Sequence, residues 1–258
     1  MSQQNNEGAK PAKDKESPIA VYLYAIVLTV VIGGVLSVIY NSLKGMHSTN
    51  EDRAKKAAIL DAVPEKSDEE VLSRFKTRIT KIVAVRPDGS VFDDVKKINA
   101  LPNRSAVQYA DINAIDLGLE DKLKPEDRVY PLYEYTTNDG KKMYIISVRG
   151  NGLWDKIWGN IAIQDDLSTI AGVYFGHKAE TPGLGAEIKD NAKWKERFNN
   201  KQIFQNGVFK PVNVKKKGYT ANDVEAISGA TVTSDGVGEM LQRGIGYYEA
   251  YLTKLKKS

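Results

Sequence analysis

The stretch YPLYEYTTNDGKKMYIISVRG, residues 130–150, decides the fold of this 258-residue chain. Two runs rich in β-branched and aromatic residues flank Asn-Asp-Gly at 138–140, a pattern typical of a tight β-hairpin turn. KIVAVRPDGSVF (81–92) predicts a strand, a Pro-Asp-Gly turn and a second strand. WGNIAIQDDLSTIAGVYFGH (158–177) predicts another strand pair. We therefore expect a mainly antiparallel sheet in the middle of the chain.

Helical patterns precede this β-rich region. STNEDRAKKAAILDAV (48–63) predicts a helix with Ser48 or Thr49 as its N-cap, because these side chains accept hydrogen bonds from the first free amides. KSDEEVLSRFKTRI (66–79) predicts a second helix with Ser67 as the cap and acidic residues in its first turn.

Helical patterns also follow the β-rich region. DNAKWKERFNN (190–200) predicts a short helix, and an apolar stripe from about Ser234 to Lys256 predicts a long final one. Because the strands are grouped and helices stand at both ends, the sequence predicts an α+β domain with its sheet flanked by helices.

An apolar segment lies near the N-terminus. IAVYLYAIVLTVVIGGVLSVIY (19–40) carries no charge over 22 residues, enough for a helix to cross a hydrocarbon core of about 30 Å. It is longer than the apolar part of a cleaved signal peptide, so a retained anchor is favoured. We expect a disordered tail at 1–17, a transmembrane helix at 18–42 and one domain at 43–258. Lysines on both sides nearly balance, so charge alone does not orient the span.

Composition excludes several classes of function. The net charge is +4, with no basic block interleaved with aromatics, so nucleic-acid binding is not expected. The chain has no cysteine, which excludes disulfides, thiolate metal sites and cysteine nucleophiles. Its two histidines, His47 and His177, cannot build a histidine-rich zinc site, and no metal site is predicted. His177 is interpreted as a structural hydrogen-bonding residue.

Two glycine-containing segments have both a structural and a functional interpretation. RGNGLWDKIWG (149–159) is either a turn followed by core aromatics or a place where backbone approaches a flat ligand. HKAETPGLGAEI (177–188) contains a tight loop with polar groups from Glu180 and Thr181 before it. That loop is either a structural turn or part of a binding site.

A third segment, VEAISGATVTSDGV (224–237), feeds small residues into a helix start. Free amides and the helix dipole favour an anion there. Thr233 or Ser234 could cap this helix, with Thr231 a few residues upstream. The alternative is that its hydroxyls only cap and pack. Lysines at 215–217 could pair with a phosphate or form a solvated loop.

These three segments, in this order behind an N-terminal span, resemble the C-type subunit of the bacterial Na⁺-translocating NADH:quinone oxidoreductase. The resemblance runs from about residue 15 to the C-terminus. ETPGLG followed by SGATVTS is much more specific than SGAT, which the G-type subunit of Rnf ferredoxin:NAD⁺ complexes shares. GLWDKIWG favours the C-type subunit of the quinone reductase. One position departs from the family pattern: Glu225 stands where an aspartate is usual.

The resemblance implies a covalent FMN, attached through a phosphoester to Thr231, which acts as a tether and not as a catalytic nucleophile. It implies no catalytic residue in this chain, whose FMN would relay electrons between an iron centre in the membrane subunits and a covalent FMN in the B-type subunit. The other cofactor-binding residues that we expect are Ser228, Gly229, Ala230, Thr233, Thr181, Leu184, Gly185, Glu180, Gly152, Leu153 and Trp154.

The resemblance also implies partners and a location. The A, B, D, E and F subunits would complete a complex that oxidises NADH, reduces quinone and exports Na⁺, and a flavin transferase would attach the FMN. The chain would cross the bacterial inner membrane once, with a cytoplasmic N-terminus and a periplasmic FMN-binding domain. The alternatives are the G-type flavoprotein subunit of an Rnf complex and a membrane-anchored binding domain without redox function.

Overall fold

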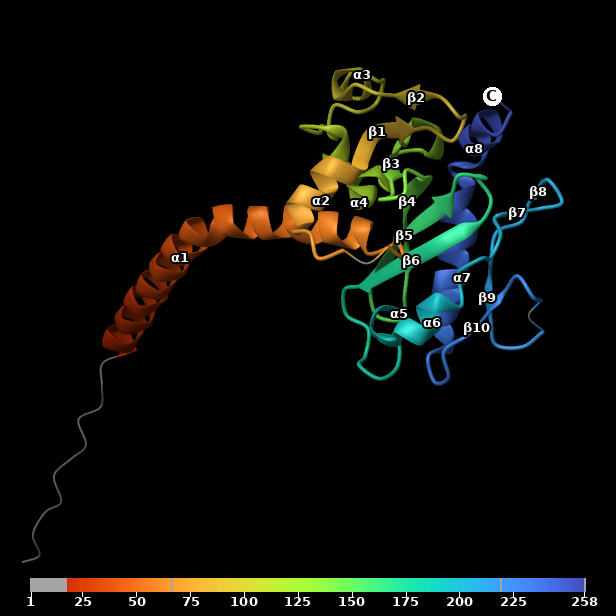
Figure 1. The fold of residues 1–258 in the computed structure, drawn as a ribbon. Coiled ribbons are helices and arrows are strands. Elements are labelled where there is room, and N and C mark those ends of the chain that lie inside the picture. The colour runs from red at the N-terminus through yellow and green to blue at the C-terminus, as the bar shows by residue number, and fades with distance from the viewer. Residues whose placement is uncertain (1–17, 66, 219, 258) are drawn as a thin grey trace, which may run out of the picture. The chain divides into compact units, whose positions relative to one another are not determined.

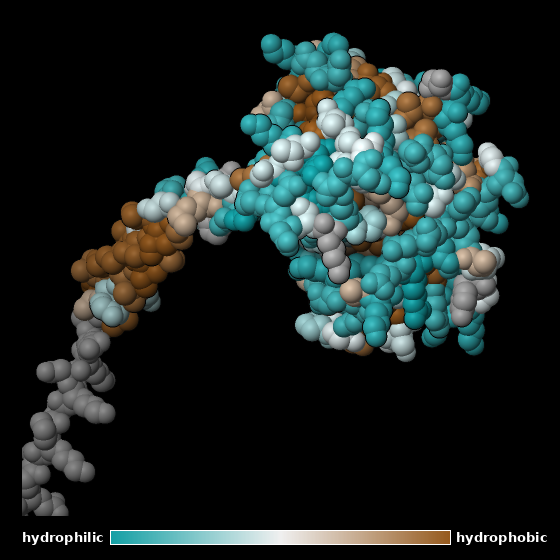
Figure 2. All heavy atoms as spheres, viewed as in Figure 1, coloured by the Kyte–Doolittle hydropathy of each residue, from teal (hydrophilic) through white to brown (hydrophobic). Residues whose placement is uncertain are grey.

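The computed structural model describes residues 18–65, 67–218 and 220–257, so the predicted tail at 1–17 lies outside the described residues. The chain divides into two compact units, Met1–Asp52 and Arg53–Ser258. In the first, the described chain is helical and belongs to α1, Pro18–Leu60 (Figure 1). Its segment Pro18–Met46 is long and apolar enough to cross a membrane, and its hydrophobic residues form the brown stretch of Figure 2.

The predicted start of a new helix at Ser48 or Thr49 is wrong. The backbone remains helical through both residues, and the Thr49 hydroxyl donates to the carbonyl of Gly45, 3.1 Å away, inside α1. No proline interrupts the sequence here, and the following run of charged residues and alanines favours helix. The apolar and charged segments therefore join into one helix, and the domain boundary near residue 42 stays a prediction.

The cap of the second helix also differs from the prediction. Helix α2, Val71–Arg78, begins after Glu70, whose carboxylate accepts from the amides of Leu72 and Ser73 at 2.9 and 3.1 Å. Ser67 instead accepts from the amide of Glu69. Glu70 stands directly before the first turn, so its charged side chain takes the capping position that Ser67 is too far upstream to reach.

The central sheet confirms the predicted antiparallel architecture. Its strand order is β2-β1-β3-β4-β5-β6, and every neighbouring pair is antiparallel. The predicted hairpin joins β3 and β4 through residues 138–140, where Gly140 adopts a φ of +81° that glycine tolerates. The strands are β1 (Ile79–Val85), β2 (Val91–Phe92), β3 (Tyr130–Thr136), β4 (Lys142–Asn151), β5 (Lys156–Gln164) and β6 (Ile170–His177).

Both faces of this sheet are covered, because successive side chains point to opposite sides. On β4, Ile146 and Val148 pack into the core shared with helix α7, Thr231–Gly246. Ile145 faces the other way and packs with Ile59 and Leu60 at the end of α1. A third cluster, which includes Ala84, Ile98 and Val129, lies under the segment between β2 and β3.

The C-terminal helix differs from the prediction. The predicted helix from Ser234 to Lys256 is in fact two helices, α7 and α8 (Glu249–Leu255). Between them Tyr247 stacks on Tyr130 with ring centroids 4.4 Å apart, and the buried Tyr248 hydroxyl donates to Pro131 and Ser147 carbonyls. These contacts break the helix.

The remaining helices and strands of the domain are short. They are α3 (Val95–Asn99), η1 (Ile112–Ala114), α4 (Leu117–Glu120), η2 (Pro125–Asp127), α5 (Glu187–Asp190), α6 (Ala192–Glu196), β7 (Phe204–Gln205), β8 (Val208–Phe209), β9 (Val214–Lys215) and β10 (Val224–Glu225).

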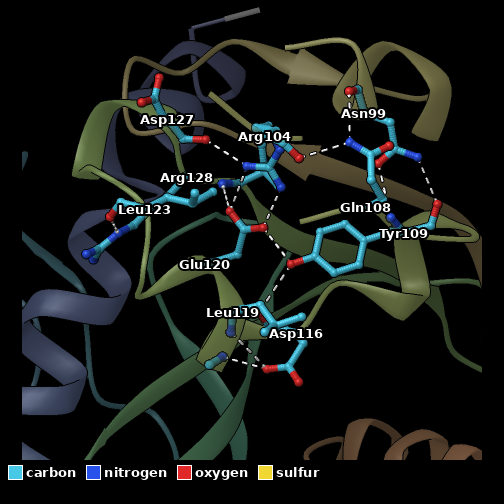
Figure 3. A network of polar contacts seen from close by, with 12 residues as sticks. Asn99, Arg104, Gln108, Tyr109, Asp116, Leu119, Glu120, Leu123, Asp127 and Arg128 are labelled. Atoms are coloured by element: carbon cyan, nitrogen blue, oxygen red, sulfur yellow. Dashed lines mark hydrogen bonds and ion pairs between the residues drawn. The ribbon is translucent and has the colours of Figure 1, made fainter. Parts of the chain in front are cut away.

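A buried ion pair organises the long connection between β2 and β3 (Figure 3). Arg104 and Glu120 are both fully buried and make two hydrogen bonds of 2.9 and 2.5 Å. Glu120 also accepts from the Tyr109 hydroxyl and from the Val129 amide. Burial and this carboxylate raise the pKa of Tyr109, so its hydroxyl stays a donor. Both oxygens of the Glu120 carboxylate are hydrogen-bonded, which a buried charge requires, whereas the buried Arg104 Nε has no partner among the described residues.

Candidate functional site

The three segments singled out in the sequence converge on one cavity of about 170 Å³. The turn between β4 and β5, the loop after β6 and the start of α7 supply its walls. The cavity is lined by Leu153, Glu180, Thr181, Leu184, Gly185, Gly229, Ala230, Thr231, Val232 and Thr233. Nine of these ten residues were predicted to bind a cofactor, and Val232 was missed.

A single carboxylate ties the three segments together. Glu180 is only 5% exposed. One of its oxygens accepts from the Trp154 amide at 3.0 Å, and the other from the Thr233 hydroxyl at 2.6 Å. Its own amide donates to His177 Nδ1 at 3.2 Å, in keeping with the structural interpretation of that histidine. Glu180 therefore holds the β4–β5 turn and α7 against its own loop.

Two glycines give this carboxylate its space. A Cβ atom at Gly152 would collide with one Glu180 oxygen, and a Cβ at Gly185 would collide with the other and lie 2.7 Å from the Thr233 hydroxyl. Gly152 does not line the cavity itself. Its position next to Glu180 explains why the turn after β4 needs a residue without a side chain.

The start of α7 corrects the predicted cap. The helix begins at Thr231, with Ala230 as the N-cap residue, so neither Thr233 nor Ser234 caps it. Thr233 is turned instead to Glu180, and the Ser234 hydroxyl accepts from the Ile227 amide at 3.0 Å, which closes the preceding turn. Both hydroxyls are thus used in packing. Alanine has no side-chain acceptor, so the first amides of α7 are left for another group.

Thr231 is the first residue of this helix and is half-buried in the cavity wall. Gly229 precedes it with a φ of +79°, which brings the chain sharply into the helix, and a Cβ there would lie 3.0 Å from Leu184. The position combines a hydroxyl, the positive end of a helix of 16 residues and small neighbours. These features suit an anionic group such as a phosphate.

Large apolar side chains surround the cavity but remain exposed. Leu153, Trp154, Leu184 and Val232 are 52%, 66%, 44% and 53% exposed. The Trp154 indole donates to the Thr181 hydroxyl at 3.2 Å, which fixes the ring across the loop. The interpretation of Trp154 as a core aromatic is therefore wrong. A group of exposed apolar side chains beside a cavity is typical of a surface that binds a ligand or a partner.

Other residues considered in the sequence lie elsewhere. Ser228 is exposed and does not line the cavity. The lysines at 215–217 line a separate hollow with Asp235 and Glu239, and Lys215 pairs with Asp223 at 3.1 Å. The signal that could have revealed Val232 is its place directly after Thr231, where the amides of a first helical turn are free.

The cavity lies within the part of the chain that matches a known protein family. Residues 152–246 match the family described as FMN-binding domain, and this range contains every residue that lines the cavity. The fold and the match together define the domain as one of the FMN-binding class.

Similarity to whole proteins is more specific. The C subunit of the Na⁺-translocating NADH-quinone reductase from Pseudomonas aeruginosa is 30% identical over 262 residues, which cover 95% of this chain and 98% of that protein. The crystal structure of the C subunit from Parabacteroides distasonis matches with a TM-score of 0.69 and 32% identity, over 82% of this chain and 97% of that one. A structure from Shewanella oneidensis shares the fold at a TM-score of 0.61 and 24% identity, over 81% of this chain and 100% of that one. The chain belongs to the family formed by the C subunits of the Na⁺-translocating NADH-quinone reductase.

The packing around Glu180 makes a testable prediction. Gly185→Ala adds a methyl group against the carboxylate and the Thr233 hydroxyl, so we expect a loss of about 1–3 kcal/mol of local stability. Hydrogen exchange at the Trp154 amide should then accelerate. Gly183→Asn is the matched control in the same loop, because nothing lies within 4 Å of a Cβ there and asparagine tolerates its positive φ. Equal hydrogen-exchange rates at the Trp154 amide in the two variants would contradict the role assigned to Glu180.

Proposed function

We propose that this chain is the FMN-carrying electron-transfer subunit of its complex, with FMN attached through a phosphoester to Thr231. The observation that supports this is the position of the Thr231 hydroxyl. It stands in the cavity wall at the first residue of α7, where an attached phosphate meets free amides. In the transfer the Thr231 oxygen would form a bond to the flavin phosphorus and lose its proton, while the bond between that phosphorus and the leaving group of the flavin donor breaks and the leaving group takes up a proton. The net gain of the protein is FMN less one water.

The residues present fit such a group. Gly229 and Ala230 leave room for a phosphate to approach the backbone, and the helix dipole favours its negative charge. A volume of about 170 Å³ is below the range of about 300–1,000 Å³ of pockets that enclose a whole ligand. Only the phosphate end would be enclosed, and the isoalloxazine ring would lie against the exposed Leu153, Trp154, Leu184 and Val232.

This arrangement suits a relay better than a substrate site. Bound FMN would supply the electron-accepting and electron-donating chemistry. The chain's own residues hold its phosphate, support its ring and keep the loops fixed through Glu180. A ring left at the surface can approach cofactors of other subunits, and a covalent bond prevents its loss.

The proposed complex and membrane location rest on the family to which the chain belongs. We expect the chain to work with the A, B, D, E and F subunits in oxidising NADH, reducing quinone and exporting Na⁺, after a flavin transferase has attached the FMN. Pro18–Met46 would anchor it in the bacterial inner membrane, with the N-terminus cytoplasmic and the FMN-binding domain periplasmic. The family match favours this setting over an Rnf complex or an anchored domain without redox function.

Intact-mass measurement of protein made in its native host tests the attachment. The native chain should carry the mass of FMN less one water. Thr231→Ala should lose it entirely, because the Thr233 hydroxyl in the same cavity donates to Glu180. Thr220→Ala removes an exposed threonine of the preceding loop and should retain the full increment. Retention of the increment by Thr231→Ala would disprove the proposed tether.

Protease treatment of spheroplasts tests the orientation. If the domain is periplasmic, protease added outside should digest it while the inner membrane is intact. The 1–17 segment should be protected under the same conditions. Digestion of the large domain only after lysis would refute the periplasmic location.

A further inference from the structure

A larger cavity lies on the sheet face opposite α7. Its volume is about 460 Å³, and among the described residues it shares no wall with the cavity at Thr231. Strands β4, β5 and β6 form its floor, and α1 from Ala54 onward forms one wall. Most of its surface comes from apolar atoms, such as those of Ala58, Ile115 and Leu117. The proposed function gives this cavity no role.

Trp158 is the most conspicuous residue in this cavity. It is 37% exposed, although its ring lies flat on β6, where a Cβ at Gly176 would come within 2.5 Å of the indole. The glycine therefore lets the ring lie against the strand with its outer face open. The interpretation of Trp158 as a core aromatic is also wrong, because its side chain, like that of Trp154, is exposed.

The polar side chains at this cavity include the cations Lys55 and Arg149, the carboxylate of Asp116, and two hydrogen-bond donors that have no partner in the described part of the chain. Within the described residues neither the Trp158 indole nitrogen nor the Tyr174 hydroxyl makes a hydrogen bond, and burial raises the pKa of Tyr174, which keeps that hydroxyl a donor. Arg149 bonds to Asp121 at 2.9 Å, and Lys55 donates to main-chain carbonyls of the loop before β3. Because the two cations already have partners, the Trp158 indole and the Tyr174 hydroxyl are the groups to be matched, and a matching partner would present hydrogen-bond acceptors beside apolar surface.

The cavity is also close in sequence to the apolar segment that is expected to cross the membrane. Ala54, in its wall, follows the end of the apolar segment at Met46 by eight residues. Eight residues reach at most about 29 Å when fully extended, so this wall stays within that distance of the span whatever the orientation of the domain. Extramembrane loops of neighbouring membrane subunits are within reach.

We propose that this cavity is a docking site for a neighbouring subunit, from which an extramembrane loop inserts a large apolar side chain beside hydrogen-bond acceptors. Trp, Tyr and Arg are the residue types that dominate the binding energy of interfaces or are enriched in them, and Trp158, Tyr174 and Arg149 meet here. A protein loop supplies both the apolar side chain and the acceptors. The inference rests on the chain being a subunit and not on its flavin.

Photo-crosslinking in the whole complex tests the proposal. Ala54→p-benzoylphenylalanine, a probe in the cavity wall, should crosslink under ultraviolet light to one other subunit. The matched probe at Lys216 lies in the separate hollow beside α7 and should give much less of the same product. Crosslinking from Ala54 only to lipid, only to a second copy of this chain, or no more than from Lys216 would overturn the proposal.

Truncation gives an independent test in the same complex. Trp158→Ala should weaken retention of the chain by the other subunits at least about tenfold. Val208→Ala, which shortens an apolar side chain that is 65% exposed elsewhere, should leave retention unchanged. The covalent flavin mass is measured in each sample, because it reports the proposed tether separately from docking. A Trp158→Ala chain with normal far-ultraviolet circular dichroism and unchanged retention would overturn the proposal.

Discussion

The buried carboxylate of Glu180 is the interaction on which the site depends. It accepts from the Trp154 amide and from the Thr233 hydroxyl, so one side chain joins the β4–β5 turn, the loop after β6 and α7. Removing either acceptor would leave a buried donor unpaired, which costs about 1–3 kcal/mol. Gly152 and Gly185 are constrained to be glycine by this carboxylate. The hydroxyl of Thr231 is held in place indirectly, through the helix that Glu180 fixes.

The sheet explains how one small domain presents two separate surfaces. Alternating side chains bury one face of β4–β6 under α7 and the other against the end of α1. The turn at the end of β4 then reaches the cavity at Thr231, whereas the residues facing the other way, such as Arg149 and Trp158, reach the larger cavity. The proposed flavin site and the proposed docking surface can therefore lie at the same two strands without using the same residues.

Local patterns predicted much of this molecule. The hairpins followed from their turns, because Asn-Asp-Gly and Pro-Asp-Gly act over a few residues, and the convergence of three segments followed from a family resemblance. One error comes from local competition between two capping residues, and the others depend on tertiary contacts. Glu70, directly before α2, caps that helix in place of Ser67. The Thr233 hydroxyl donates to Glu180 and does not cap α7. The break at Tyr247 depends on its stacking against Tyr130 from a distant strand. The Arg104–Glu120 pair had no sequence signal, since its partners meet only when the connection folds onto the sheet.

The central claim is that one hydroxyl among several carries the flavin. Trypsin should release residues 218–243 as a single peptide, because Lys217 and Arg243 bound a stretch without internal lysine or arginine. Its serines and threonines are Thr220, Ser228, Thr231, Thr233 and Ser234. Fragmentation of the peptide from protein made in its native host should place the mass of FMN less one water on Thr231. The same mass on Thr220, on Thr233 or on either serine, or an unmodified peptide, would contradict the account.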